Sequence, residues 1–250
     1  MAPRFTAVSY HQLGLSDLTS CIITAFAFSL LTRRAFILRP FDNMRIQDGM
    51  GMPNFDWSAI DIANLSIINI AHFNTGGDEP LSPYAKDFRT GNVSTIGENF
   101  DVVNFQDCNY GATYHLTENP YHKSTLARMG LRPDTIFGCL FDYLFSPLPE
   151  VLRIFERELA VMRDTSTLKI AIQIRTGDEA MLARDMDDSE GALSKLLWQH
   201  RAYFMCAHQI QMERAVNGQK VVWLLVTDNE QLRHAAALRF PDLVLTNLKR

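Results

Sequence analysis

The stretch LKIAIQIRTGD (168–178) decides the fold. A nearly continuous apolar run ends in the cation Arg175, and a polar Thr-Gly-Asp sequence follows it. Such a run is typical of a parallel strand that is covered on both faces of its sheet. A second run of this type, VVWLLVTD (221–228), ends in Thr227 and Asp228. We therefore predict two buried parallel strands that deliver polar side chains at their carboxyl ends.

The segments around these strands alternate between helix and strand. Apolar residues recur at helical spacing over 148–163, 191–216 and 229–240, and LVLTNL (243–248) starts a third strand. This alternation predicts a doubly wound parallel sheet.

The first half of the chain shows weaker patterns of the same kind. We predict helices over 15–32, 58–68 and 121–130, strands over 35–40, 69–74 and 101–105, and a loop over 41–58.

The composition is that of an ordinary globular protein. The chain has 250 residues, 47% of them hydrophobic and 21% charged, with a net charge of −4. This charge gives no global attraction to nucleic acid or to an anionic membrane surface. The longest apolar run, CIITAFAFSLL (21–31), is too short to span a bilayer. We expect no nucleic-acid partner and no membrane span in this chain.

The four cysteines include no C-x-x-C pair, so we do not expect a zinc site. Cys21, Cys139 and Cys206 lie in apolar surroundings and are predicted to be buried thiols. Cys108 lies in a polar stretch and is the expected disulfide partner.

Ligands of open parallel sheets bind beyond the carboxyl ends of the strands. Arg175 offers a planar fork suited to two phosphate oxygens, and a helix begins directly after Asp228. These features indicate a nucleotide or another phosphate ligand, with Asp228 either accepting from a ribose or base or capping the helix. The alternative is that Arg175 simply pairs with Asp178.

Other sequence motifs give weaker indications of function. The chain has no G-x-x-x-x-G-K-[ST], no G-x-G-x-x-G and no G-x-S-x-G sequence, which argues against common nucleoside triphosphatases, dehydrogenases and serine hydrolases. Asp185-Met-Asp187-Asp188 resembles a metal clamp, but a solvated loop is the favoured interpretation.

Four segments resemble the GDP-fucose-dependent fucosyltransferases of the GT-B fold, above all the plant xyloglucan type and related fungal and algal sequences. IAIQIRTGD resembles the strand-end motif of the family, with Gln173 before Arg175. The other three segments follow the order of the family motifs: they are 14–38, 130–152 and 221–242.

The resemblance implies two Rossmann-like domains with parallel sheets. Residues 1–150 would form the acceptor-side domain, and residues 151–250 a partial GDP-sugar domain. It also implies an inverting transfer of fucose from GDP-fucose to a glycan or glycoprotein acceptor, without a metal or other cofactor, in the Golgi or secretory pathway.

The resemblance assigns a role to each candidate residue. Arg175 would clamp the diphosphate and stabilise its charge as GDP leaves. Thr227, Asp228 and Gln173 would lie beside the nucleotide, and Gly14 and Asp17 at the start of the first helix. Asp178 and Glu179 are the nearest candidates for the base.

Two departures from the family pattern favour an alternative. Leu18 stands where the family has an arginine, and the chain ends just inside a strand, before a further family motif. The second hypothesis is therefore a catalytically inactive fucosyltransferase-like binding protein or a fragment. An unrelated nucleotide-binding α/β protein is the third.

Overall fold

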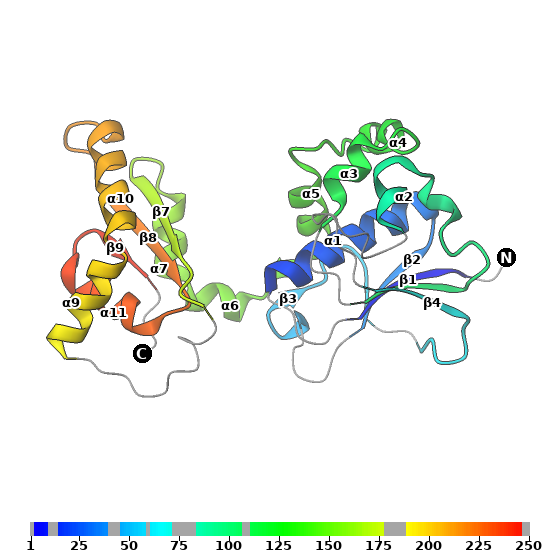
Figure 1. Cartoon of the computed structure of the whole chain (residues 1–250), viewed down its shortest axis with the longest axis horizontal. Helices are drawn as coiled ribbons and strands as arrows, with labels where there is room; N and C mark the ends of the chain where they lie inside the picture. The colour runs from blue at the N-terminus through cyan, green and yellow to red at the C-terminus, as the bar shows by residue number, and fades with distance from the viewer. Residues whose placement is uncertain are drawn as a thin grey trace. The chain divides into compact units, whose positions relative to one another are not determined.

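The computed structural model describes residues 3–9, 15–39, 46–58, 61–71, 84–106, 111–177 and 189–246. The chain divides into two compact units, Met1–Val151 and Leu152–Arg250, called unit 1 and unit 2 below (Figure 1). The roles predicted for the two halves, acceptor-side and donor-side, stay predictions.

Unit 1 is built on a parallel sheet in the order β2-β1-β5-β4, and β3 pairs with β6 antiparallel. Its elements are β1 (Phe5–Ser9), α1 (Leu15–Thr32), β2 (Ala35–Leu38), η1 (Ile46–Asp48), β3 (Met50–Gly51), β4 (Ile67–Ala71), α2 (Ala85–Thr90), η2 (Val93–Thr95), β5 (Val102–Gln106), α3 (Thr113–Glu118), α4 (Lys123–Arg128), α5 (Ile136–Leu144) and β6 (Ser146–Pro147).

Helix α1 lies at the centre of unit 1. It spans Leu15–Thr32, as predicted, and its residues 21–29 are all buried. A helix that is apolar all round must be covered on every side. The sheet covers one side of α1, and α3 and α5 contact it from others (Figure 1).

Buried Arg34 ties the start of the sheet together. Its side chain is only 6% exposed. The guanidinium donates hydrogen bonds to the carbonyl oxygens of Phe5, Gly97, Phe100 and Asp101. One side chain thereby joins the beginning of β1 to the turn before β5.

His122 forms a second buried polar contact in unit 1. Its ring is 6% exposed, and Nε2 accepts a hydrogen bond from the backbone N–H of Val93 at 3.0 Å. Only a neutral ring can accept at Nε2. Burial lowers the pKa of His122, and burial followed by the charge of Arg89 lowers the pKa of His115.

We expect unit 1 to lose stability in weak acid. A histidine whose pKa is lower in the folded state contributes stability in full above the unfolded pKa of about 6.5, and loses it as the pH falls towards the folded pKa. Each histidine then adds a slope of at most about 1.4 kcal/mol per pH unit. Urea unfolding at pH 7.5 and 5.5 measures this slope.

The substitution His122→Gln keeps an acceptor for Val93 and should reduce the slope. His208→Gln replaces an exposed histidine of unit 2 and is the control. An unchanged slope in His122→Gln would contradict the prediction.

Unit 2 has a parallel sheet in the order β7-β8-β9. Its elements are β7 (Leu168–Ile174), β8 (Val221–Thr227), β9 (Val244–Leu245), α7 (Glu156–Arg163), α9 (Glu190–Gln199), α10 (Arg201–Arg214) and α11 (Glu230–Arg239). The short helix α6 (Pro149–Ile154) contains the boundary between the units.

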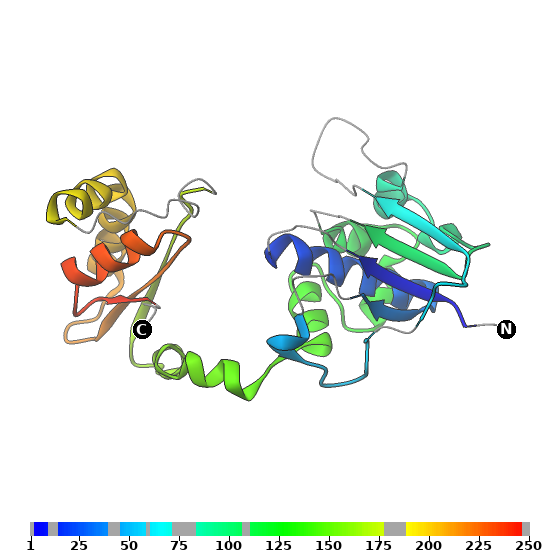
Figure 2. The same ribbon diagram turned by 90° about the horizontal axis from the view of Figure 1, so that it is seen from below.

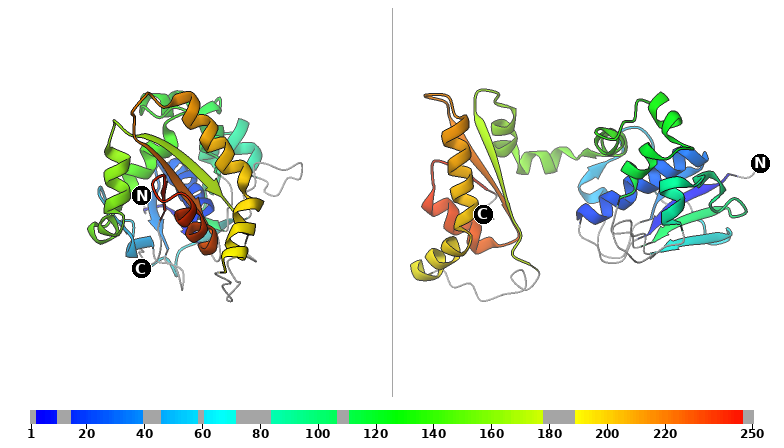
Figure 3. Two further views of the ribbon diagram at one scale, coloured as in Figure 1. Left: turned by 90° about the vertical axis from the view of Figure 1, so that its left-hand side faces the viewer. Right: turned by 45° about the horizontal axis from the view of Figure 1, so that its top comes forward.

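One face of this sheet holds the core of unit 2. Alternate residues of β7 and β8 share one apolar cluster with α10 and α11: Ile170, Ile172, Ile174, Val221, Trp223, Leu225, Phe204, Ala207, Leu232 and Ala236. Figures 2 and 3 show α10 alongside these strands. The helices α10 and α11, which belong to the two connections between the strands, therefore lie on the same face of the sheet. The described strands follow one another in one direction along the sheet, in the order β7-β8-β9, whereas the predicted doubly wound sheet would extend in two directions.

The other face is less covered than predicted. Ala171 and Gln173 of β7 are exposed, and Val226 of β8 is 56% exposed. The prediction that 168–175 is covered on both faces is wrong, because only every second residue of β7 is buried.

Several other expectations need correction. The predicted helix over 58–68 is replaced by turns and the start of β4; the helix over 148–163 is broken at Phe155, and that over 191–216 at His200.

The cysteines also differ from the prediction of three buried thiols. Cys21 is disulfide-bonded, whereas Cys139 and Cys206 are free but exposed. Cys108 and Asp185–Asp188 lie outside the described residues. No helix in the described ranges is long and apolar enough to cross a membrane.

Candidate functional site

The carboxyl ends of β7 and β8 meet at one edge of the unit 2 sheet. The strands are parallel, with Ile174 paired to Thr227. The residues that follow them, Arg175–Gly177 and Asp228–Asn229, therefore lie side by side. Sequence reasoning predicted this juxtaposition from the two strand patterns alone.

Asp228 binds the loop that follows β7. Its Oδ1 accepts from the backbone N–H of Thr176 at 2.8 Å and from the Thr176 hydroxyl at 2.9 Å. Its Oδ2 accepts from the N–H of Gly177 at 3.2 Å. Gly177 has φ 99°, a conformation that side chains disfavour. The carboxylate therefore fixes the backbone directly after Arg175.

These hydrogen bonds also set the charge of Asp228. Burial by itself raises the pKa of this carboxyl group, but the bonds from Thr176 and Gly177 outweigh it, and the net pKa is lowered. The carboxylate is thus ionised at neutral pH, and its contribution to stability is lost only as the pH falls below about 3.8 through the folded pKa.

Asn229, not Asp228, caps the next helix. Its side chain accepts from the N–H of Leu232 at 2.9 Å, and α11 begins at Glu230. The Thr227 hydroxyl accepts from the N–H of Asn229 at 3.2 Å. The suggestion that Asp228 caps the helix is therefore wrong, and Asp228 acts on the neighbouring loop instead.

Arg175 and Gln173 both lie exposed at this edge. They continue the alternation of β7, in which Ile172 and Ile174 point into the core. This explains how a strand with a buried face delivers a guanidinium at its end. The proposed pairing of Arg175 with Asp178 is not tested, because Asp178 and Glu179 lie outside the described residues.

A cavity of about 390 Å³ lies beside the strand end, which we call the strand-end cavity. Its walls include Thr227 from β8, Arg233 from α11, Thr246 after β9, and Phe155 and Glu158 near α7. Arg233 donates from Nη1 to the carbonyl of Thr227 at 2.7 Å, while its Nε is buried without a hydrogen-bond partner.

Sequence reasoning missed three polar residues of this cavity, Arg233, Thr246 and Glu158. The position of Arg233 one helical turn after the Asn229 cap was the one available signal. Glu158 comes from a helix that no local pattern connects with the strand ends.

The residues predicted in the first half lie in unit 1. Asp17 is half-buried in the first turn of α1, and Gly14 lies outside the described residues. Leu18, which stands where the family has an arginine, is fully buried in the unit 1 core. The described residues contain no group of His, Cys, Asp and Glu side chains suited to a metal ion.

Solved structures share this architecture. A mutant of Arabidopsis thaliana FUT1 in complex with GDP matches all of the chain with a TM-score of 0.64 and 14% identity. Fucosyltransferase NodZ from Bradyrhizobium matches all of it with a TM-score of 0.55 and 15% identity. The chain has the same fold as these two structures. This confirms the predicted mixed α/β architecture with two parallel sheets of GT-B type.

The matches extend over different shares of the known proteins. The chain spans 60% of the length of the FUT1 structure and 80% of the NodZ structure. A NodZ structure co-crystallised with GDP matches with a TM-score of 0.53. No protein-family model matches the chain, and no curated protein sequence matches it. The likeness is therefore one of fold.

Proposed function

We propose that this chain is a glycosyltransferase domain that binds GDP-fucose at the Arg175–Asp228 strand end and transfers fucose to a glycan acceptor. The observation that supports this most is the Asp228 carboxylate, whose three hydrogen bonds hold the loop that presents Arg175. The proposal is also supported by the fold, which the chain shares with structures that contain GDP.

In this proposal, Arg175 forms paired hydrogen bonds with the diphosphate. The acceptor hydroxyl oxygen attacks the anomeric carbon of fucose from the face opposite GDP, which inverts its configuration. The bond from that carbon to the β-phosphate oxygen breaks, and GDP leaves with the bonding electrons. Arg175 neutralises the charge that develops there, so no metal ion is required.

The remaining residues take supporting roles in the proposal. Thr227, Gln173 and the strand-end cavity would contact the nucleotide, and Asp228 would position Arg175. The hydroxyl proton would pass to Asp178 or Glu179. The contributions of Gly14 and Asp17 from unit 1 stay predictions. The disulfide at Cys21 supports an oxidising compartment, as the secretory pathway provides.

Nucleotide titration calorimetry tests the donor. GDP should bind with the same affinity with and without EDTA. GMP, which lacks the second phosphate, should bind at least about tenfold more weakly, because one charge-assisted contact of roughly 1.5 kcal/mol is lost. ADP should also bind more weakly than GDP. Equal affinities for GDP and ADP would favour an unrelated nucleotide-binding α/β protein.

A catalytically inactive binding protein is the second candidate. Burial of Leu18 in the unit 1 core favours it, because no guanidinium is available at that position. Release of GDP from GDP-fucose, measured with and without glycan acceptors, separates the two candidates. Binding of GDP without any turnover would support the inactive protein.

The loop geometry gives a prediction of its own. Replacing Asp228 with asparagine puts an NH₂ group against an N–H of Thr176 or Gly177, so at least one hydrogen bond is lost. Because the carboxylate is only half-buried, we expect a cost of about 1 kcal/mol. The amide of Gly177 should exchange with solvent about fivefold faster, as NMR would show.

Asp164→Asn is the matched control for this experiment. Asp164 accepts from Ser166 and Thr167 before the opposite end of β7. Its replacement removes the same charge but should leave the exchange of Gly177 unchanged. Slow exchange of Gly177 in Asp228→Asn would contradict the role assigned to Asp228.

A further inference from the structure

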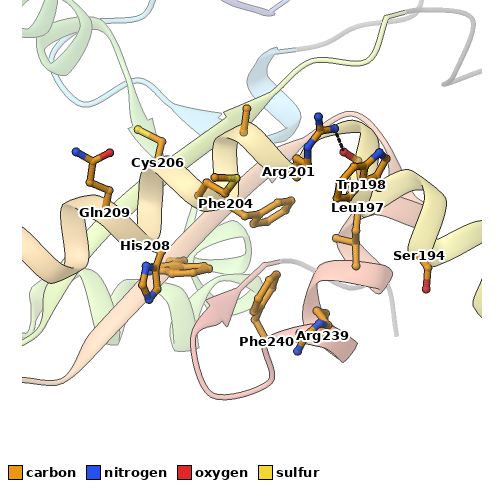
Figure 4. Close-up of a pocket in the computed structure, with 13 residues that line it drawn as sticks. Ser194, Leu197, Trp198, Arg201, Phe204, Cys206, His208, Gln209, Arg239 and Phe240 are labelled. Carbon is orange, nitrogen blue, oxygen red and sulfur yellow. Dashed lines mark hydrogen bonds between the residues drawn. The ribbon is translucent and has the colours of Figure 1, made fainter.

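A second, larger cavity lies on the helical side of unit 2. Its volume is about 900 Å³, within the range that small-molecule sites occupy (Figure 4). It lies between α9, α10 and the end of α11, and Trp223 of β8 contributes to its wall. It shares no lining residue with the strand-end cavity. We call it the aromatic cavity.

The wall of the aromatic cavity is mainly apolar. The ring of Phe240 stacks on Phe204 at 5.4 Å between centroids and lies against Trp223 at 5.3 Å. The indole N–H of Trp223 donates to the side chain of Gln211, so a ligand in the cavity does not need to accept a hydrogen bond from it. Trp198 and Met205 also line the cavity, and they are 65% and 67% exposed. Large apolar side chains left in water in this way often mark a binding site.

The charges on the wall have one sign. The guanidinium of Arg201 lies 4.0 Å from the centre of the Trp198 ring, and its Nη1 donates to the carbonyl of Trp198 at 2.9 Å. Arg239 lies over Phe240 at 5.4 Å. Among the described residues that line the cavity, none has a carboxylate. An anion would therefore meet two cations and no opposing charge.

Each guanidinium is held against an aromatic ring, which keeps its donors near the apolar wall. Figure 4 shows both arginines and the rings of Phe204 and Phe240 around the cavity. This arrangement suits a ligand with a flat apolar body and one anionic group. The body would pack on the rings while its anion accepts from an arginine.

We propose that the aromatic cavity is a ligand site for a small amphipathic anion, an aromatic or alicyclic carboxylate, sulfonate or phosphate ester. The site is separate from the proposed donor site, and it does not depend on fucosyl transfer. Its occupancy should leave the affinity for GDP unchanged.

Two cysteines in the described part of the chain are free and exposed, and they give a test with an internal control. Cys206 lines the aromatic cavity, whereas Cys139 lies in unit 1. The probe is 8-anilinonaphthalene-1-sulfonate, an aromatic anion, and N-phenyl-1-naphthylamine is its neutral analogue. Modification of each thiol by N-ethylmaleimide is followed by peptide mass spectrometry with and without each probe.

At ten times its dissociation constant, the anionic probe fills about nine sites in ten, so the modification of Cys206 should slow by about tenfold. Cys139 should react at an unchanged rate, and the neutral analogue should protect Cys206 much less. The double variant R201Q/R239Q should lose the protection, while R214Q, which replaces an exposed arginine outside the cavity, should retain it.

Three results would overturn the proposal: no protection of Cys206, equal protection of Cys206 and Cys139, or equal protection of Cys206 by both probes. The last would mean that the arginines do not recognise the anion. Because the experiment contains no nucleotide, its failure leaves the proposed donor site untouched, and failure of GDP binding leaves this site untouched.

Discussion

Replacing Arg175 with alanine is expected to weaken GDP binding by roughly a hundredfold. The guanidinium lies at the carboxyl end of β7, exposed, next to a loop that Asp228 fixes with three hydrogen bonds. Loss of charge-assisted hydrogen bonds to a diphosphate costs about 3 kcal/mol, which corresponds to that factor. Titration calorimetry with GDP measures it directly.

Two further variants sharpen this experiment. Arg175→Lys keeps a positive charge but not the planar fork, so it should recover only part of the affinity. Arg214→Ala removes an exposed arginine from the end of α10 and should bind GDP like the unmodified chain. Because Arg175 is exposed, Arg175→Ala should change the stability of unit 2 by less than about 0.5 kcal/mol, as surface substitutions usually do. Undiminished GDP affinity in Arg175→Ala would remove Arg175 from the site.

Replacing Arg34 with methionine is expected to destabilise unit 1 strongly. Arg34 is 6% exposed and donates to four carbonyl oxygens from the start of β1 and the turn before β5. Methionine fills a similar volume but leaves these oxygens without their charged donor. Hydrogen bonds to charged groups contribute about 1.5–3 kcal/mol each and do not add fully, so we expect a loss of roughly 3 kcal/mol or more.

Hydrogen exchange in urea, read by mass spectrometry on peptides from Cys21–Phe28, reports the unfolding of unit 1 by itself. Arg39→Met is the control, because Arg39 is exposed just after β2. It should cost less than about 0.5 kcal/mol, as surface substitutions usually do. Equal effects of the two substitutions would contradict the role assigned to Arg34.

Local patterns predict the elements in which one physical signal dominates. Helix α1 matches its predicted range because a long apolar run with helical spacing fits only a helix. Strands β7 and β8 match because their apolar runs end at clear polar residues. The helix breaks at Phe155 and His200 were not visible, because the apolar spacing continues through both. The pairing of β3 with β6 joins Gly51 to Ser146, and no local pattern reports such a distant contact.

The same limit applies to the candidate site. The two strand patterns predicted that Arg175, Thr227 and Asp228 lie at one sheet edge. The sequence did not predict that the Asp228 carboxylate holds the loop after β7. Its partners Thr176 and Gly177 lie about 50 residues earlier in the chain and contribute mainly backbone N–H groups. The aromatic cavity was also not predicted, because it requires three helices and a strand to meet.

Hydrogen–deuterium exchange with and without GDP tests the central claim most directly. If the strand end of unit 2 binds the diphosphate, GDP should slow exchange in peptides that contain Ile174–Gly177 and Thr227–Glu230. Peptides from α10, beside the aromatic cavity, should be unaffected. If saturating GDP slows exchange elsewhere but not at these two strand ends, the strand end of unit 2 is not the GDP site.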